Sequence, residues 1–213
     1  MSETHLQATV GADRSNPGDG SSLAVRRGKE GGLLTQSVTA RYQQAVLGGN
    51  VFGVANQVGV ASQAGLSATT PVLTLANPLG SGVNAVIWFV GAAMSVVNVA
   101  AAAIHVAVNS NTAAAAVTGT LTTTHRNMLV GASGNPKCNT FLAATLPTAP
   151  VSIGTLGVGL TGALTVSTTS PVHGRWYDGG LILKPNTTLT LQTKTASGAL
   201  GLWCEYIWEE FPV

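Results

Sequence analysis

The sequence has few charged side chains, and its long middle section has no carboxylates at all. Asp, Glu, Lys and Arg together make up 8% of its 213 residues, against roughly 25% in an ordinary globular domain. No Asp or Glu occurs between Glu30 and Asp178. Because most hydrolytic, glycosidic and metal-dependent mechanisms use carboxylates, this absence argues against an enzyme. So little charge also predicts a chain that buries much of its surface against partners.

The residues that bind metals or cofactors are sparse and widely spaced. Cys138 and Cys204 form no C-x-x-C motif, so we expect free thiols, with a disulfide between them as the alternative. The four histidines stand singly, and nothing in the sequence places His125 beside Cys138 as a base beside a nucleophile. Gly157–Gly162 fits the pattern G-x-G-x-x-G, but a strand is expected after it, which indicates a glycine-rich loop between strands. We therefore expect no catalytic residues, no metal and no cofactor.

Neither nucleic acid nor a membrane is an expected partner. The net charge of +2 is too small to predict nucleic-acid binding. Val83–Val108 is apolar and long enough to cross a bilayer. However, Asn84, Asn98 and His105 interrupt it and its β-branched and aromatic residues favour strands, so we interpret it as two buried strands. The first ten residues are polar, and we expect no signal peptide.

The chain divides into an N-terminal part, residues 1–50, and a β domain, residues 51–213. Residues 1 to about 32 are rich in turn residues and predict a flexible arm. Leu33–Leu47 has helical periodicity and predicts one short helix. We expect this part to dock on a partner surface; the candidate contacts are Arg26, Arg27, Lys29, Leu34, Val38, Arg41 and Tyr42. The three basic residues of the arm could touch phosphate, but an acidic protein surface is the favoured partner.

From Val51 onward the pattern is that of an antiparallel β-sandwich. The expected strands are Ala85–Val97, Ala100–Val108, Val117–Thr123, Thr140–Leu146, Ala163–Thr168, Val172–Tyr177, Gly180–Leu183, Thr187–Thr193 and Leu200–Glu209. Lys184–Asn186 predicts a turn with Pro at its second position. The last strand alternates, with Leu202, Cys204, Tyr206 and Trp208 on one face and Trp203, Glu205, Ile207 and Glu209 on the other. Such hairpins indicate an all-β sandwich.

Two clusters near the C-terminus are candidates for function or packing. His173, Arg175, Trp176, Tyr177 and Asp178 gather within six residues. They form either a patch for a sugar or partner, or a strand end that packs at a subunit contact, which we favour because interfaces select arginine and aromatics. For the aromatic cluster Trp203, Tyr206, Trp208 and Phe211 we expect core packing, with Glu209 and Glu210 beside it exposed or paired.

Three parts of the chain resemble virion proteins of tailed bacteriophages. The first is Arg27–Phe52 (RGKEGGLLTQSVTARYQQAVLGGNVF). The second is Asn77–Asn84 (NPLGSGVN), which leads into an apolar strand. The third runs from Gly179–Asn186 (GGLILKPN) to Tyr206–Pro212 (YIWEEFP). The middle of the chain carries no such likeness.

The resemblance implies a jelly-roll-type β-sandwich that forms trimers on the outside of a phage particle. The implied function is a capsid decoration or cement protein, made in the host cytoplasm, which binds copies of itself and the major capsid protein and stabilises the shell. The alternative is a head or tail fibre module that recognises a host-surface glycan. An enzyme such as a depolymerase is disfavoured, because the central chain lacks carboxylates.

Overall fold

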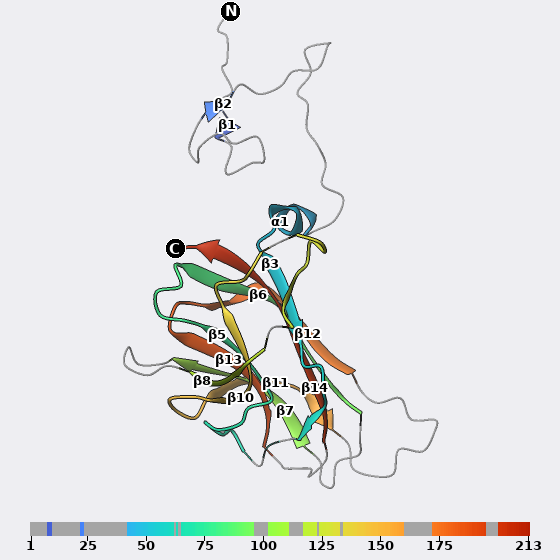
Figure 1. Ribbon diagram of the computed structural model, residues 1–213. Helices are drawn as coiled ribbons and strands as arrows, with labels where there is room; N and C mark the ends of the chain where they lie inside the picture. The colour runs from blue at the N-terminus through green and yellow to red at the C-terminus, as the bar shows by residue number, and fades with distance from the viewer. Residues whose placement is uncertain are drawn as a thin grey trace, which may run out of the picture. The chain divides into compact units, whose positions relative to one another are not determined.

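The computed structural model describes residues 8–9, 22–23, 42–61, 63, 65–95, 102–110, 117–122, 124–132, 134–159, 172–194 and 200–213 (Figure 1). Within these ranges there is one helix, α1 (Gln43–Gly48). The strands are β1 (Ala8–Thr9), β2 (Ser22–Leu23), β3 (Val51–Ala55), β4 (Val60–Ala61), β5 (Leu73–Asn77), β6 (Val83–Met94), β7 (Ala102–Ser110), β8 (Thr118–Leu121), β9 (Arg126–Asn127), β10 (Asn139–Thr145), β11 (Val151–Gly159), β12 (Val172–Leu183), β13 (Thr187–Thr193) and β14 (Leu200–Pro212).

The strands from β3 onward form two antiparallel sheets packed as a sandwich (Figure 1). The β13 sheet has the order β11-β7-β13-β5-β10-β8. The β14 sheet has the order β12-β6-β14-β3-β9, with β4 also paired to β14. From β5 to β7, and again from β11 to β14, each strand lies in the sheet opposite to that of its predecessor. This alternation is typical of a jelly roll, so the expected all-β, jelly-roll-like sandwich is confirmed.

The compact unit that contains both sheets begins at Gln44, and residues 1–43 form a separate unit. In that separate unit β1 pairs with β2, and Ala8 lies opposite Leu23. Of the predicted helix Leu33–Leu47, the structure describes the part from Tyr42, where α1 begins at Gln43 and ends one residue later than expected, at Gly48. Residues 33–41 lie outside the described residues.

The inward faces of the two sheets form one hydrophobic core. Leu73 and Leu75 of β5 and Leu189 and Leu191 of β13 are fully buried against residues of the β14 sheet. Burying each such side chain stabilises the fold by roughly 1.5–3 kcal/mol. The hydroxyl of Tyr206 crosses the core and donates a hydrogen bond of 2.8 Å to the carbonyl of Leu73. The expected alternation of the last strand is therefore confirmed.

The outward face of the β13 sheet is buried as well. Thr74, Thr188, Thr190 and Gln192 alternate with the core leucines and are fully buried. The segment Gly65–Thr70 lies against this face, because the side chain of Gln192 accepts a 2.7 Å hydrogen bond from the Ser67 amide and donates one of 2.9 Å to its carbonyl. A second apolar cluster, Ala76, Phe141, Ala144 and Leu146 with Ala68 and Val117 against it, extends the cover. The sandwich thus has a third layer on this side.

One apolar stretch of the sequence folds as its pattern predicted, whereas a glycine-rich stretch folds differently. The apolar run from Val83 forms β6 and then β7, as expected, and none of the described helices has the length and apolarity to cross a membrane. By contrast, β11 was not predicted, and the interpretation of Gly157–Gly162 as a loop is wrong for Gly157–Gly159. These three residues pair with Ala102–Ile104 of β7 in an antiparallel ladder whose register shifts between Ser152 and Gly154 and again between Thr155 and Gly157. The predicted strand Ala163–Thr168 lies outside the described residues.

Candidate functional site

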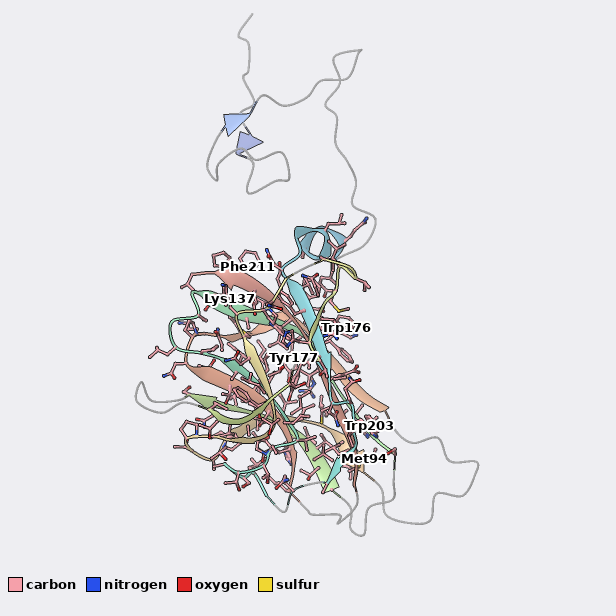
Figure 2. All side chains as sticks on the ribbon, in the orientation of Figure 1. Met94, Lys137, Trp176, Tyr177, Trp203 and Phe211 are labelled. Atoms are coloured by element: carbon pink, nitrogen blue, oxygen red, sulfur yellow. The ribbon has the colours of Figure 1, made fainter. Side chains whose placement is uncertain are left out.

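The structure divides the His173–Asp178 cluster between the two faces of β12. Strand alternation turns Arg175 and Tyr177 inward and Trp176 outward, and Figure 2 shows Tyr177 within the sandwich and Trp176 away from it. Asp178 sits at a bulge, with positive φ values of 50° at Asp178 and 85° at Gly179. The five residues therefore do not form one patch.

The inward part of this cluster closes the gap between the edge strands β12 and β11. The Arg175 guanidinium donates a 3.0 Å hydrogen bond to the carbonyl of Thr155 and lies 5.9 Å from the centre of the Tyr177 ring. His173 lies so close to Gly157 that a Cβ there would be 2.2 Å from Nδ1 of the imidazole. Glycine in β11 is what lets the other sheet's side chains approach its backbone. These contacts give His173 and Arg175 a role in joining the sheets.

The outward part belongs to an aromatic pair on the outer face of the β14 sheet. The rings of Trp176 and Phe89 lie 5.0 Å apart, centre to centre, at 51°. Phe89 covers Gly174 on the neighbouring strand, where a Cβ would lie 2.6 Å from its Cζ atom. Since neither Gly174 nor Gly91 has a side chain, the Phe89 ring lies down on the sheet and supports Trp176, which stays 55% exposed.

A second exposed tryptophan lies on the same face, two residues from a carboxylate. Trp203 is 37% exposed, and its Nε1 donates a 2.9 Å hydrogen bond to the Ser95 hydroxyl, which fixes the orientation of the indole. Glu205 is exposed and its side chain lies over Gly91. A hollow of about 160 Å³ opens here, lined by Ala55, Asn56, Gly91, Ala92, Ala93, Trp203, Cys204 and Glu205. Core packing is thus confirmed for Tyr206 and Trp208 but wrong for Trp203 and Phe211, which are exposed.

A larger hollow, of about 440 Å³, lies beside β9 and the start of β10. It is lined by Leu121, His125, Arg126, Asn127, Ala132, Gly134, Asn135, Pro136, Cys138, Asn139 and Thr140. His125 and Cys138 therefore meet in one hollow, which the sequence did not indicate. Burial, and the carboxylate of Glu210 after it, raise the pKa of the Cys138 thiol far above its ordinary value. An activated nucleophile needs the opposite shift, so this cysteine is placed as a packing residue.

Glu210 explains why the backbone at Cys138 is fixed. Its buried carboxylate accepts 2.8 Å hydrogen bonds from the amides of Lys137 and Cys138 and a 3.2 Å bond from the Trp208 indole. The expectation that the terminal glutamates are exposed or paired is confirmed for Glu210. Cys204 is also a buried free thiol, so the two cysteines are unpaired.

The remaining candidate residues belong to the N-terminal part. Tyr42 is half-buried and directly precedes α1. Arg26, Arg27, Lys29, Leu34, Val38 and Arg41 lie outside the described residues. In the part of the chain that the structure describes, no three His, Cys, Asp or Glu side chains gather as metal ligands. Comparisons with protein-family models, curated proteins and solved structures give no match.

Proposed function

We propose that this chain is a structural protein of a tailed-phage virion, a decoration or cement protein that forms homotrimers and stabilises the capsid shell. It is not an enzyme in this proposal. The N-terminal part docks on the major capsid protein, and the sandwich supplies the contacts between copies. The observation that carries the proposal is the chemistry of the sheet edges.

Both edge strands of the β13 sheet are free of charge. The sequences of β8 (TGTL) and β11 (VSIGTLGVG) contain no Lys, Arg, Asp or Glu. Leu121 of β8 and Val151, Ile153 and Val158 of β11 are exposed. Soluble monomers usually protect such edges with charged residues, proline or a covering segment, because open edges pair with other chains. Arg175 and His173 cover part of β11, at Gly154–Gly157, so the open stretches are β8 and the beginning of β11 at Val151–Ile153. The simplest partner for these stretches is another copy of the chain.

Within the sandwich, the described parts of the segments that resemble phage proteins support the proposal because they lie at one end of the two sheets. The side-chain amide of Asn77 donates hydrogen bonds to the main-chain carbonyls of Val83, at 2.8 Å, and Leu183, at 2.9 Å. The main-chain N–H of Asn186 donates a hydrogen bond of 2.8 Å to the main-chain carbonyl of Asn77. At the same end β14 pairs with the first residues of β6 and β3, including Val51. The described residues that carry the likeness are therefore neighbours in the sandwich, although they are far apart in the sequence.

The oligomeric part is tested by the mass of the full chain in solution, measured by light scattering. We expect a trimer. Val151→Lys places a charge on the β11 edge and should shift the chain towards monomer. Val130→Lys is the matched control, because Val130 is exposed in the loop after β9, away from both edges, and should leave the mass unchanged. A monomeric parent chain, or equal behaviour of the two variants, contradicts the proposed contact.

The docking part is tested by cosedimentation with capsid shells of the phage that carries the gene. Replacing Arg26, Arg27 and Lys29 together by alanine should weaken binding and leave the mass in solution unchanged. The control replaces three exposed lysines of the sandwich, Lys137, Lys184 and Lys194, by alanine, which changes the net charge equally. If both triple variants sediment with shells like the parent, the N-terminal cations do not dock.

A second candidate is a head or tail fibre module that binds a host-surface glycan. It is favoured by the two exposed tryptophans on the outer face of the β14 sheet. Copy number separates the two functions: a decoration protein is spread over the whole shell, whereas a fibre component is present in a few copies at one vertex or at the tail. Mass spectrometry of purified virions, with imaging of the particles, measures this directly.

A further inference from the structure

We infer that the outer face of the β14 sheet is a binding site for a neutral oligosaccharide, formed by Trp176, Phe89, Trp203 and Glu205. The site is independent of the decoration function proposed above, since it needs neither a shell nor a second copy, and it gives the glycan of the second candidate function a chemical class and a place on the sheet. Of the His173–Asp178 cluster only Trp176 belongs to this site; the other residues of the site come from β6 and β14.

The register of three strands places these side chains on one surface. Trp176 of β12 pairs with Phe89 of β6, and Phe89 pairs with Ile207 of β14. One step along the strands, Gly174 pairs with Gly91, which pairs with Glu205, and Glu205 pairs with Ala55 of β3. The next row holds Ala93 opposite Trp203. This row of Gly174, Gly91, Glu205 and Ala55 separates the Trp176–Phe89 pair from Trp203, and the Phe89 ring and the Glu205 side chain both lie over Gly91. Figure 2 shows both tryptophans on the same side of the sandwich.

Each tryptophan is held in place while part of its indole remains in solvent. Trp176 is supported by Phe89 at 5.0 Å, and Trp203 is fixed by its 2.9 Å hydrogen bond to Ser95. A rigid, exposed aromatic face gives contact area at little cost in side-chain entropy. The C–H face of a pyranose ring stacks on such an indole, and the hollow of about 160 Å³ beside Trp203 has room for one sugar ring.

The charges on this face select the ligand. In the middle of this sheet, the strands β3, β6 and β14 contain no Lys or Arg, while Glu205 and Glu209 both alternate outward. The one cation that the described residues add to this outward face, Arg126, lies at the β9 edge opposite Gly53, two strands away from β14. An anionic glycan would be repelled by the two carboxylates. An apolar protein surface would bury Glu205 without a partner, which is costly. A neutral glycan instead offers hydroxyl donors to the carboxylate while its ring faces cover the indoles.

The test is an array of neutral oligosaccharides printed beside sialylated, uronic-acid and sulfated ones, probed with the full chain. A neutral sugar bound on the array is then titrated by tryptophan fluorescence. We expect binding to neutral members only. Trp176→Ala and Trp203→Ala should each weaken it by about tenfold or more, a loss typical of an aromatic contact at the centre of a site. Leu79→Ala and Val130→Ala, which remove exposed apolar side chains in the loops after β5 and β9, are the matched controls and should bind like the parent.

The carboxylate has its own test. Glu205→Gln keeps a hydrogen-bond acceptor and should retain neutral-sugar binding within about threefold, whereas Glu205→Ala should lose about tenfold. Absence of binding to every neutral sugar, or binding that the two tryptophan variants leave intact, overturns the inference. A change in the solution mass of Trp176→Ala or Trp203→Ala, with no sugar bound by the parent, would instead make this face a contact between copies. Thermal unfolding of each variant shows that it is folded.

Discussion

The outward faces of the two sheets differ in what covers them. On the β13 sheet the chain covers its own outer face, and Thr74, Thr188, Thr190 and Gln192 are sealed beneath Gly65–Thr70 and the second apolar cluster. On the β14 sheet the outer face keeps two tryptophans in solvent. The outer face of the β13 sheet therefore buries polar residues, whereas the outer face of the β14 sheet exposes aromatic ones. The difference teaches that the covered face contributes stability, whereas the open face is available to a ligand or partner.

The largest effect is expected on the covered face. Gln192→Ala removes both hydrogen bonds to Ser67 and leaves the main-chain amide and carbonyl of that half-buried residue without this partner, which should lower the free energy of unfolding by about 2 kcal/mol. Urea denaturation followed by fluorescence measures the change. Gln57→Ala is the control, because Gln57 is exposed and, among the described residues, its side chain donates to the carbonyl of Ala55, two residues away. If the two variants are equally stable, the cover does not hold the sheet.

A smaller effect is expected on the open face. Trp203→Ala should lower the free energy of unfolding by about 1 kcal/mol, since the indole is partly in solvent and gives up one surface hydrogen bond. Trp208→Ala, on the inward side of the same strand, should cost about 4 kcal/mol. If Trp203→Ala lowered the free energy of unfolding nearly as much as Trp208→Ala, the open face would be packed like a second core.

Two threonines of the β13 sheet sharpen the comparison, because replacing each by valine should change the stability in different directions. The hydroxyl of Thr74 is buried and makes no hydrogen bond to any described residue. Thr74→Val should therefore leave stability unchanged or raise it by up to about 1 kcal/mol. Thr193→Val should lower it by about 2 kcal/mol, because the Thr193 hydroxyl accepts a 2.6 Å bond from the Gln63 amide and donates one of 3.0 Å to its carbonyl. Thermal melts of the two variants, run together, distinguish these signs.

The smallest effect concerns Glu209 on the open face. Partial burial raises the pKa of its carboxyl group, and a hydrogen bond from Trp88 opposes this shift. The folded chain therefore holds this proton to a higher pH than the unfolded chain, so the group costs stability only as the pH rises above its ordinary pKa of 4.5. Glu209→Gln should raise the melting temperature slightly at neutral pH, and the gain should vanish at about pH 4. A gain that is independent of pH contradicts this assignment.

The sequence predicted the fold class because its signals are local. Alternation in Leu200–Glu209 identified the core face of β14, and Lys184–Asn186 forms the expected turn, with Asn186 at a φ of 69°. It did not predict β11, because three glycines in Val151–Gly159 weaken the pattern of alternation. Two of these glycines, Gly154 and Gly157, are explained by Arg175 and His173, which come from the other sheet and need the space.

The candidate site could be predicted only in part, for a related reason. Trp176 stood out in the sequence, and Trp203 and Glu205 were placed together on one face of their strand. What joins them is the register of β12 and β14 on β6, which pairs residues far apart in the chain. No local pattern specifies that register. Phe89 was missed because, within an apolar strand, an outward aromatic residue looks like a core residue.

The position of β14 has a consequence for how the protein is made. This strand lies in the middle of its sheet, between β6 and β3, yet it comes after every other strand in the chain. During synthesis, β3 and β6 leave the ribosome with no neighbour between them and with their apolar faces unprotected. The sandwich closes only once residues 200–212 have emerged, so its folding is dominated by distant pairings. Nascent copies made on one messenger therefore need protection from one another until that last strand arrives.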